Sequence, residues 1–243
     1  KGGYGTLTVS EILEQSSNIG VSRLIDRAYH NSPQKFVDGL KDLGVGVPLN
    51  LPFVGKGEPV IPQPNSKKRF WSNTDLAWMS IGYVTLLTPI HTLTFYNGIA
   101  NNGRMVKPRF VKAEKDNGIV VREFPTEVIR EKMCSQRTLD DIHDILEKVV
   151  SKGLGKRAGN GGKLLKKRGK TGTAQTGVVK GGKRVTNSWF CGFFPFETPK
   201  YAVTIVWENS STGCGPIFKA IADKVTEYES KERSFLLDAP RQY

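Results

Sequence analysis

Apolar side chains recur three and four positions apart in seven segments of the chain, which is the spacing of one face of a helix. Residues 19–29 are typical, because Val21, Leu24, Ile25 and Ala28 fall on one side of a helix. The pattern predicts helices over residues 8–13, 19–29, 33–43, 74–83, 88–101, 138–150 and 216–229.

The carboxy-terminal third of the chain has a different pattern, in which apolar residues occupy extended runs bounded by turn sequences. The dipeptides Gly181-Gly182 and Thr198-Pro199 are turn signals between such runs. They predict three antiparallel strands, over residues 168–179, 186–195 and 201–208. Residues 105–131 alternate shorter strands with turns.

Three segments show neither period. Five prolines between positions 48 and 64 predict a long surface loop over residues 45–72. Residues 153–162 are glycine-rich, and the residues after Ser230 form a polar tail by composition. A chain of 243 residues is long enough for one sizeable core, and one domain is the simplest expectation.

The chain is basic, with 36 Lys and Arg against 23 Asp and Glu and a net charge of +13. A basic balance of this size is found in proteins with anionic partners. Five of the cations cluster at Lys163, Lys166, Lys167, Arg168 and Lys170. No RNA-binding signature with interleaved aromatic residues is present, so we expect no nucleic-acid partner.

Cysteine and histidine offer little chemistry. The three cysteines, Cys134, Cys191 and Cys214, have no metal-binding spacing, and we expect unpaired thiols. The three histidines are isolated from one another and are expected to be structural or exposed. No run of about 20 apolar residues is present to span a membrane.

The sequence Lys170-Thr171-Gly172-Thr173 combines a cation, two hydroxyls and a glycine in a predicted strand. Because side chains alternate along a strand, Lys170 and Gly172 share one face, while Thr171 and Thr173 share the other. Gly172 lets another backbone approach closely, so a peptide-like ligand can pair along this strand. The alternative is an ordinary basic hairpin edge.

Ser16-Ser17-Asn18 lies between two predicted helices, where a helix cap is the simplest interpretation. Read together with the downstream Lys-Thr-Gly, however, this Ser-x-Asn resembles the penicillin-recognising acyl-transferases. Segments between and after the two motifs are similar to monofunctional, class B penicillin-binding proteins. They are Met79-Ser80-Ile81-Gly82-Tyr83, Leu87-Thr88-Pro89, Ile99-Ala100-Asn101-Asn102-Gly103, Val149-Val150-Ser151-Lys152-Gly153-Leu154-Gly155 and Trp189-Phe190-Cys191-Gly192-Phe193-Phe194-Pro195.

This resemblance implies an α+β transpeptidase fold, with a five-stranded antiparallel sheet flanked by helices. Three of those strands are predicted here, so residues 1–243 are expected to be the carboxy-terminal part of a single transpeptidase domain. The strand 201–208 is then expected to pair with an amino-terminal strand of the domain or with a second copy of the chain.

The implied activity is D-alanyl-D-alanine transpeptidation of peptidoglycan stem peptides through a serine acyl-enzyme, with β-lactams as inhibitors. In that scheme Ser16 is the relay hydroxyl and Asn18 holds the substrate amide. Lys170 supplies positive potential, Thr171 and Thr173 bind the terminal carboxylate, and Gly172 admits the ligand. The N–H of Thr173 is one oxyanion donor. No metal or organic cofactor is implied.

The nucleophile itself is expected outside this sequence. The family's Ser-x-x-Lys precedes Ser-x-Asn, and the fifteen residues before Ser16 contain no match. The match at Ser32-Pro33-Gln34-Lys35 comes after it, and we interpret Ser32 as a helix cap. The 243 residues alone are therefore expected to be inactive. A serine β-lactamase and a non-catalytic receptor or scaffold on the same fold are the alternatives.

The resemblance also implies a cellular setting. Class B relatives are anchored in the bacterial inner membrane and face the periplasm, and no anchor is found in these residues. The implied partners are stem peptides, β-lactams, a membrane-embedded glycosyltransferase, and division or elongation proteins.

Overall fold

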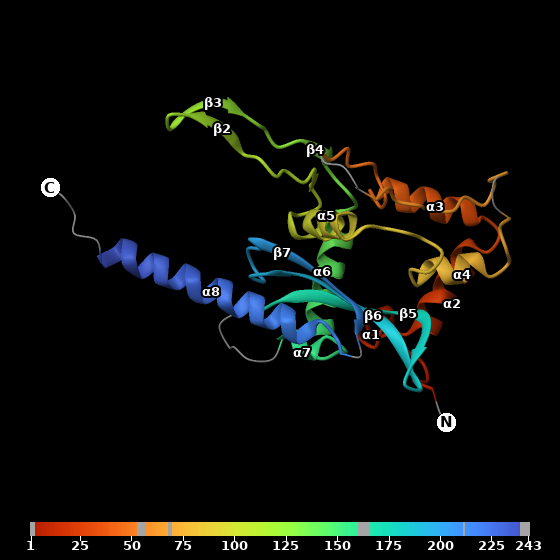
Figure 1. Ribbon diagram of the computed structural model, residues 1–243. Coiled ribbons are helices and arrows are strands. Elements are labelled where there is room, and N and C mark those ends of the chain that lie inside the picture. The colour runs from red at the N-terminus through yellow and green to blue at the C-terminus, as the bar shows by residue number, and fades with distance from the viewer. Residues whose placement is uncertain (1–2, 53–56, 68–69, 160–165, 211, 239–243) are drawn as a thin grey trace. The chain divides into compact units, whose positions relative to one another are not determined.

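The structure is a computed structural model that describes residues 3–52, 57–67, 70–159, 166–210 and 212–238 (Figure 1). Parts of the predicted long loop and of the glycine-rich run, Lys163 of the basic cluster and the end of the predicted tail lie outside the described residues. The chain divides into two compact units, Lys1–Leu146 and Glu147–Tyr243. The expectation of a single domain stays a prediction.

The first unit is mainly helical. α2 contacts α1, α3 and α4, and α5 packs against β1. At the start of α1, Thr8 and Glu11 form a capping box, which satisfies backbone donors of the first turn. The helices are α1 (Val9–Glu14), α2 (Asn18–Tyr29), α3 (Pro33–Asp42), α4 (Asp75–Ser80), α5 (Pro89–Ala100) and α6 (Gln136–Ser151), and α6 continues into the second unit.

Four short strands complete the first unit. β1 (Met105–Val106) pairs with β4 (Val128–Arg130), and β2 (Ala113–Asp116) pairs with β3 (Ile119–Glu123), both antiparallel. Figure 1 shows the β2–β3 hairpin projecting from the helices of this unit. All five residues of β3 are exposed. This confirms the predicted alternation of short strands and turns.

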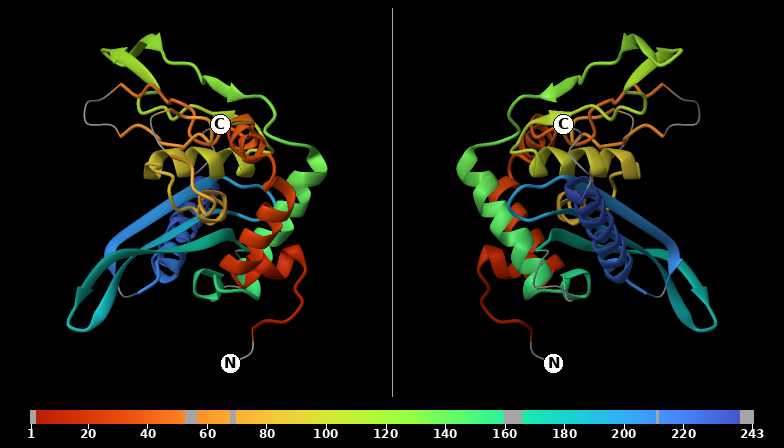
Figure 2. Two further views of the ribbon diagram at one scale, coloured as in Figure 1. Left: turned by 90° about the vertical axis from the view of Figure 1, so that its right-hand side faces the viewer. Right: turned by 90° about the vertical axis from the view of Figure 1, so that its left-hand side faces the viewer.

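The second unit is a three-stranded antiparallel sheet in the order β5-β6-β7, covered on one face by a long helix. Its elements are α7 (Lys156–Gly159), β5 (Arg168–Lys180), β6 (Lys183–Phe194), β7 (Tyr201–Ser210) and α8 (Gly215–Asp238). In register, Lys170 lies opposite Cys191, and Thr186 pairs with Ser210 at the end of β7. The tip of the β5–β6 hairpin therefore extends beyond β7 (Figure 2).

An aromatic cluster joins the sheet to α8. Phe190 and Phe194 on β6 meet Phe218 on α8, with ring centroids 4.5 and 5.8 Å from the Phe218 ring. All three side chains are buried, and Ala222 packs beside them one turn further along α8. Burying three phenylalanines contributes several kcal/mol, which makes this cluster the main link between helix and strands.

Most predicted elements are confirmed, including the helix–strand order and the antiparallel sheet. The glycine-rich run, for which no element was predicted, contains a helical turn, α7, at Lys156–Gly159, where Ala158 is buried in the core. One prediction about the carboxy-terminal third is wrong. The polar tail is instead helical as far as Asp238. Glu227 forms ion pairs with Lys224 and Lys231 at helical spacing, which stabilises a polar helix.

Two predicted caps are correct in position but not in bonding. Ser32 is at the N-cap position of α3, and Thr88 is at that of α5, yet neither side chain accepts a cap hydrogen bond. The Thr88 hydroxyl lies 2.6 Å from Nδ1 of His91, which is buried. Burial lowers the pKa of His91, so this histidine is a structural residue, as expected.

No helix of the described residues is long and apolar enough to cross a membrane. The far edge of β7 has no strand partner among the described residues. Pairing of that edge with another strand stays a prediction.

Replacing Phe218 by alanine is expected to destabilise the protein by about 3–5 kcal/mol, because it leaves a cavity between α8 and β6. Tyr228→Ala, on the same helix at a side chain that is 67% exposed, is the matched control and is expected to cost less than about 1 kcal/mol. Urea denaturation of the two variants measures both changes. Equal losses would show that the aromatic cluster does not hold α8 to the sheet.

Candidate functional site

The candidate residues fall into two groups, one in each unit. Ser16, Ser17 and Asn18 form the turn from α1 into α2 in the first unit. Ser16 has a φ of 49°, a left-handed conformation that non-glycine residues rarely adopt and that is enriched at functional sites. Ser17 caps α2, and its hydroxyl accepts a hydrogen bond of 3.2 Å from the N–H of Gly20. Ser17 therefore supports the turn, as predicted.

A groove of about 880 Å³ opens beside this turn, and all of its lining residues belong to the first unit. Ser16, Ser17 and Asn18 line it together with Arg23 and Arg27 of α2. The two arginines are one helical turn apart, so both lie on the same side of α2. They were not singled out from the sequence, although their spacing of four residues was a readable signal.

Lys170, Thr171, Gly172 and Thr173 lie in the first half of the sheet's edge strand, β5. Lys170 pairs in register with Cys191 and Thr171 with Phe190, so the alternation predicted from the sequence is confirmed. The Lys170 ammonium donates a 3.0 Å hydrogen bond to the Thr171 carbonyl. Burial lowers the pKa of Lys170 to about 8, since a low-dielectric environment disfavours its cation.

We call the side of β5 that faces away from β6 the open edge, because no described strand pairs there. The glycines of β5 differ in what surrounds them. A methyl group at Gly169 would lie 2.6 Å from the Phe190 ring and 2.7 Å from the Cys191 carbonyl, which is too close. At Gly172 the nearest atom would be Cβ of Trp189 at 3.4 Å, an ordinary contact. Packing of the fold therefore requires glycine at Gly169 but not at Gly172.

The beginning of β5 is held by two buried cations. The Lys167 ammonium, whose side chain is 1% exposed, lies 2.9 Å from a carboxylate oxygen of Asp223 on α8. Burial alone raises the pKa of Asp223, but hydrogen bonds from Lys167 and Lys219 outweigh it, and the pKa is lowered. The Arg168 guanidinium donates to the Phe196 carbonyl and lies over the Phe196 ring. These contacts fix the strand that carries Lys170.

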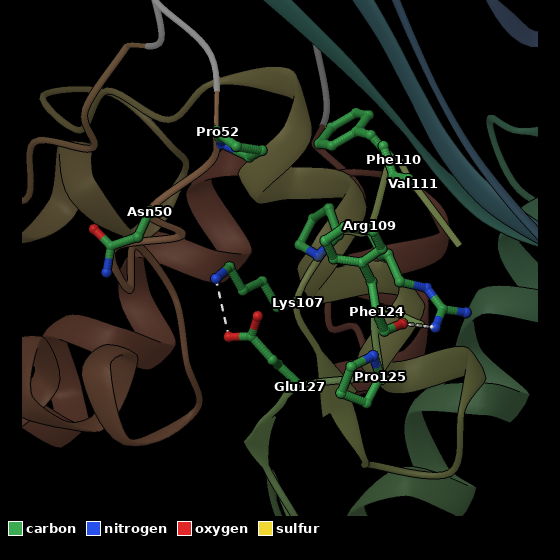
Figure 3. Close-up of a pocket in the computed structure, with 10 residues that line it drawn as sticks. Asn50, Pro52, Lys107, Arg109, Phe110, Val111, Phe124, Pro125 and Glu127 are labelled. Carbon is green, nitrogen blue, oxygen red and sulfur yellow. Dashed lines mark hydrogen bonds and ion pairs between the residues drawn. The ribbon is translucent and has the colours of Figure 1, made fainter. Parts of the chain in front are cut away.

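A second pocket, of about 340 Å³, lies in the first unit beside β4 (Figure 3). Phe110, Phe124 and three prolines make it mainly apolar. Its charged groups have partners within the pocket, since Lys107 forms an ion pair with Glu127 and Arg109 donates a hydrogen bond to the Phe124 carbonyl. None of its described lining residues is a serine, threonine, cysteine or histidine.

The candidate functional side chains therefore lie on β5 and in the turn between α1 and α2. The turn presents a hydroxyl and an amide beside two guanidinium groups. The open edge presents backbone groups, a half-buried cation and two hydroxyls, which suits an extended ligand with a terminal carboxylate. Such a combination of strand edge and cation indicates peptide recognition.

Comparison with known proteins identifies the family. The sequence model of the family described as the penicillin binding protein transpeptidase domain matches residues 1–227. The chain belongs to this family. The curated relatives include the peptidoglycan D,D-transpeptidases FtsI of Buchnera aphidicola and of Escherichia coli K12. Each is 28% identical, over 238 and 229 residues, or 93% and 90% of this chain.

Solved structures of this transpeptidase family show the same fold. Penicillin-binding protein 3 of Mycobacterium tuberculosis, in complex with aztreonam, is 26% identical over 92% of this chain, with a TM-score of 0.78. The D,D-transpeptidase domain of an Eggerthella lenta peptidoglycan glycosyltransferase is 25% identical over 95%, with a TM-score of 0.76. The predicted α+β transpeptidase fold is thereby confirmed.

The chain spans only part of these proteins. It covers 38% and 35% of the two FtsI sequences and 52% of the penicillin-binding protein 3 chain.

Gly169 and Gly172 of β5 give a direct test of what the fold requires. Gly169→Ala is expected to destabilise the protein by about 1–3 kcal/mol, because the new methyl group overlaps β6. Gly172→Ala is expected to leave the free energy of unfolding within about 0.5 kcal/mol of the parent. Chemical denaturation measures both, and a loss at Gly172 as large as that at Gly169 would contradict the assignment.

Lys170 is expected to lower stability at neutral pH, because folding buries its charge. Between a folded pKa of about 8 and the ordinary value of 10.5, the unfolded chain binds more protons than the folded one. Stability of the parent therefore rises with pH across that window, and below it the penalty is fully present. Lys170→Met is expected to be more stable than the parent at pH 7, with a smaller difference at pH 10. A difference that is the same at both values would exclude the burial penalty.

Proposed function

We propose that this chain is the substrate-holding part of a peptidoglycan D,D-transpeptidase. The observation that carries the proposal is the open edge of β5, where a half-buried cation and two hydroxyls lie beside a glycine that packing does not require. An extended donor peptide with a carboxy-terminal D-Ala-D-Ala fits that edge by main-chain pairing. β-Lactams bind the same edge through their carboxylate. The relatives bear the corresponding names, and one solved neighbour holds aztreonam.

Each residue has a distinct part in the proposed reaction. Lys170 approaches the donor carboxylate from one face of β5, while the hydroxyls of Thr171 and Thr173 approach it from the other. The Thr173 N–H stabilises the oxyanion that forms when a serine attacks the penultimate carbonyl. Ser16 relays a proton to the leaving D-alanine, and Asn18 binds the donor amide. The serine that becomes acylated is not assigned to any residue described here.

The lowered pKa of Lys170 suits this function. A cation that is already stripped of much of its hydration loses little on binding, so its attraction to a carboxylate is strong. Binding of the carboxylate in turn favours the charged lysine. The stability lost by burying Lys170 is therefore recovered when ligand binds.

The proposed setting is the outer face of the bacterial inner membrane, where stem peptides occur and division or elongation proteins and a glycosyltransferase assemble. The net charge of +13 fits an environment of anionic wall polymer and lipid headgroups. A serine β-lactamase and a non-catalytic receptor remain distinct alternatives, and the lifetime of the penicillin adduct separates them. A long-lived adduct supports the transpeptidase, rapid hydrolysis supports the lactamase, and no adduct supports the receptor.

In the full-length protein, Lys170→Ala is expected to slow acylation by a fluorescent penicillin about 10²–10³-fold, the usual cost of removing one well-aimed electrostatic contact. The fold should persist, because the replaced side chain lies on an edge strand. The measurement is the rate of adduct formation.

The matched control for that experiment is Lys224→Ala on α8, which removes an equal charge from a side chain that is 77% exposed. It is expected to acylate at the parent rate. If Lys170→Ala also acylates within a few-fold of the parent, Lys170 has no part in the reaction.

A further inference from the structure

The β5–β6 hairpin contains a small recess that the proposed reaction does not use. Pairing between the strands is irregular between Gln175 and Val179, where β5 has three residues opposite Val185 alone. The Thr176 hydroxyl donates to the Val185 carbonyl and accepts from the Val178 N–H, which stabilises the bulge. A cavity of about 220 Å³ lies at this point and is lined by residues of both strands.

One cation is held at this recess. Arg184 of β6 lines it, and its Nη1 donates a 2.9 Å hydrogen bond to the Gln175 side chain across the ladder. A guanidinium has five donors in a planar fork, so one bond to Gln175 leaves others able to bind a carboxylate. The hydrogen bond to Gln175 orients the Arg184 guanidinium, and its other N–H groups can donate to a ligand.

Charge around the recess is of one sign. The sequence has no aspartate or glutamate between Lys163 and Phe196, a stretch that contains the whole hairpin. Lys180 near the tip adds a further exposed cation. On this sheet the carboxylate of Glu208 belongs to β7, which is two strands from the open edge of β5. An anionic group at the recess thus meets cations and no competing carboxylate of the hairpin.

The burial pattern along β5 sets the direction of an extended ligand. Arg168 and Gly169 are buried, whereas Thr173 and most residues after it are exposed. A donor whose terminal carboxylate lies between Lys170 and Thr173 can therefore extend only toward the hairpin tip. Residues along a strand are about 3.3 Å apart, so the third residue from the donor's carboxyl end lies about 7 Å further along. If the terminal residue lies beside Thr173, the third lies beside Gln175.

We propose that the recess of Gln175 and Arg184 is an anion subsite for a side-chain carboxylate on the third residue from the donor's carboxyl end. This inference rests on the proposed function, since it places the donor along β5. It makes the protein selective for stem peptides that are acidic at that position over those in which the carboxylate is amidated or absent. Arg184 is then a specificity-determining residue.

The test compares two acetylated donor tripeptides, L-Glu-D-Ala-D-Ala and L-Gln-D-Ala-D-Ala, which are nearly isosteric and differ by one charge. Release of D-alanine by the full-length protein gives kcat/KM for each. The acid is expected to be preferred about two- to five-fold, since the ion pair is partly exposed. Arg184→Gln is expected to bring this ratio to about one, Arg184→Lys to keep it above one, and Lys224→Gln, the control, to leave it as in the parent.

The outcomes separate the two claims. Equal use of both donors by the parent, or an unchanged preference in Arg184→Gln, overturns the subsite and leaves the transpeptidase standing. Release of D-alanine from neither donor, with no penicillin adduct, overturns the proposed function and the subsite with it. A preference for the acidic donor that is lost in Arg184→Gln and kept in Arg184→Lys supports both the subsite and the proposed function.

Discussion

The one-sided pairing of β5 is the constraint on which the rest of the second unit depends. On its inner side the strand approaches β6 so closely that Gly169 and Gly192 leave no room for a methyl group. Phe190 and Phe194 pack β6 against α8, and the Lys167–Asp223 ion pair holds the start of β5 to the same helix. These contacts make the strand rigid, and a rigid edge can bind a peptide without the entropy cost of ordering a loop.

Partial burial of Lys170 is unfavourable for stability, whereas the proposed function requires its cation at this edge. Desolvation lowers its pKa to about 8, so the folded protein holds an unfavourable charge at neutral pH. The two neighbouring cations are stabilised by direct contacts, because Lys167 has a carboxylate partner and Arg168 lies over an aromatic ring. Two cations thus stabilise the fold, and the proposed function assigns the third, Lys170, to the carboxylate of the ligand.

Much of this could be predicted from the sequence, because the elements carry strong periodic patterns and the two motifs have a characteristic order. The face alternation of Lys170 and Thr171 followed from strand geometry alone. Other features depend on tertiary contacts that no local pattern encodes. The helical turn at Ala158 forms inside a glycine-rich run because the core accepts that side chain. The Thr88 hydroxyl bonds to His91 rather than to the backbone, and the recess at Arg184 arises from a bulge without a sequence signature.

The proposed function depends on binding of an extended ligand's carboxylate at the open edge of β5. The most direct measurement is a crystal structure of the full-length protein acylated by a β-lactam. We expect the ligand's carboxylate to lie within hydrogen-bonding distance of Lys170 and of the Thr171 or Thr173 hydroxyl, with its amide paired along β5. A ligand whose carboxylate lies away from β5, for example in the apolar pocket beside β4, would contradict this expectation.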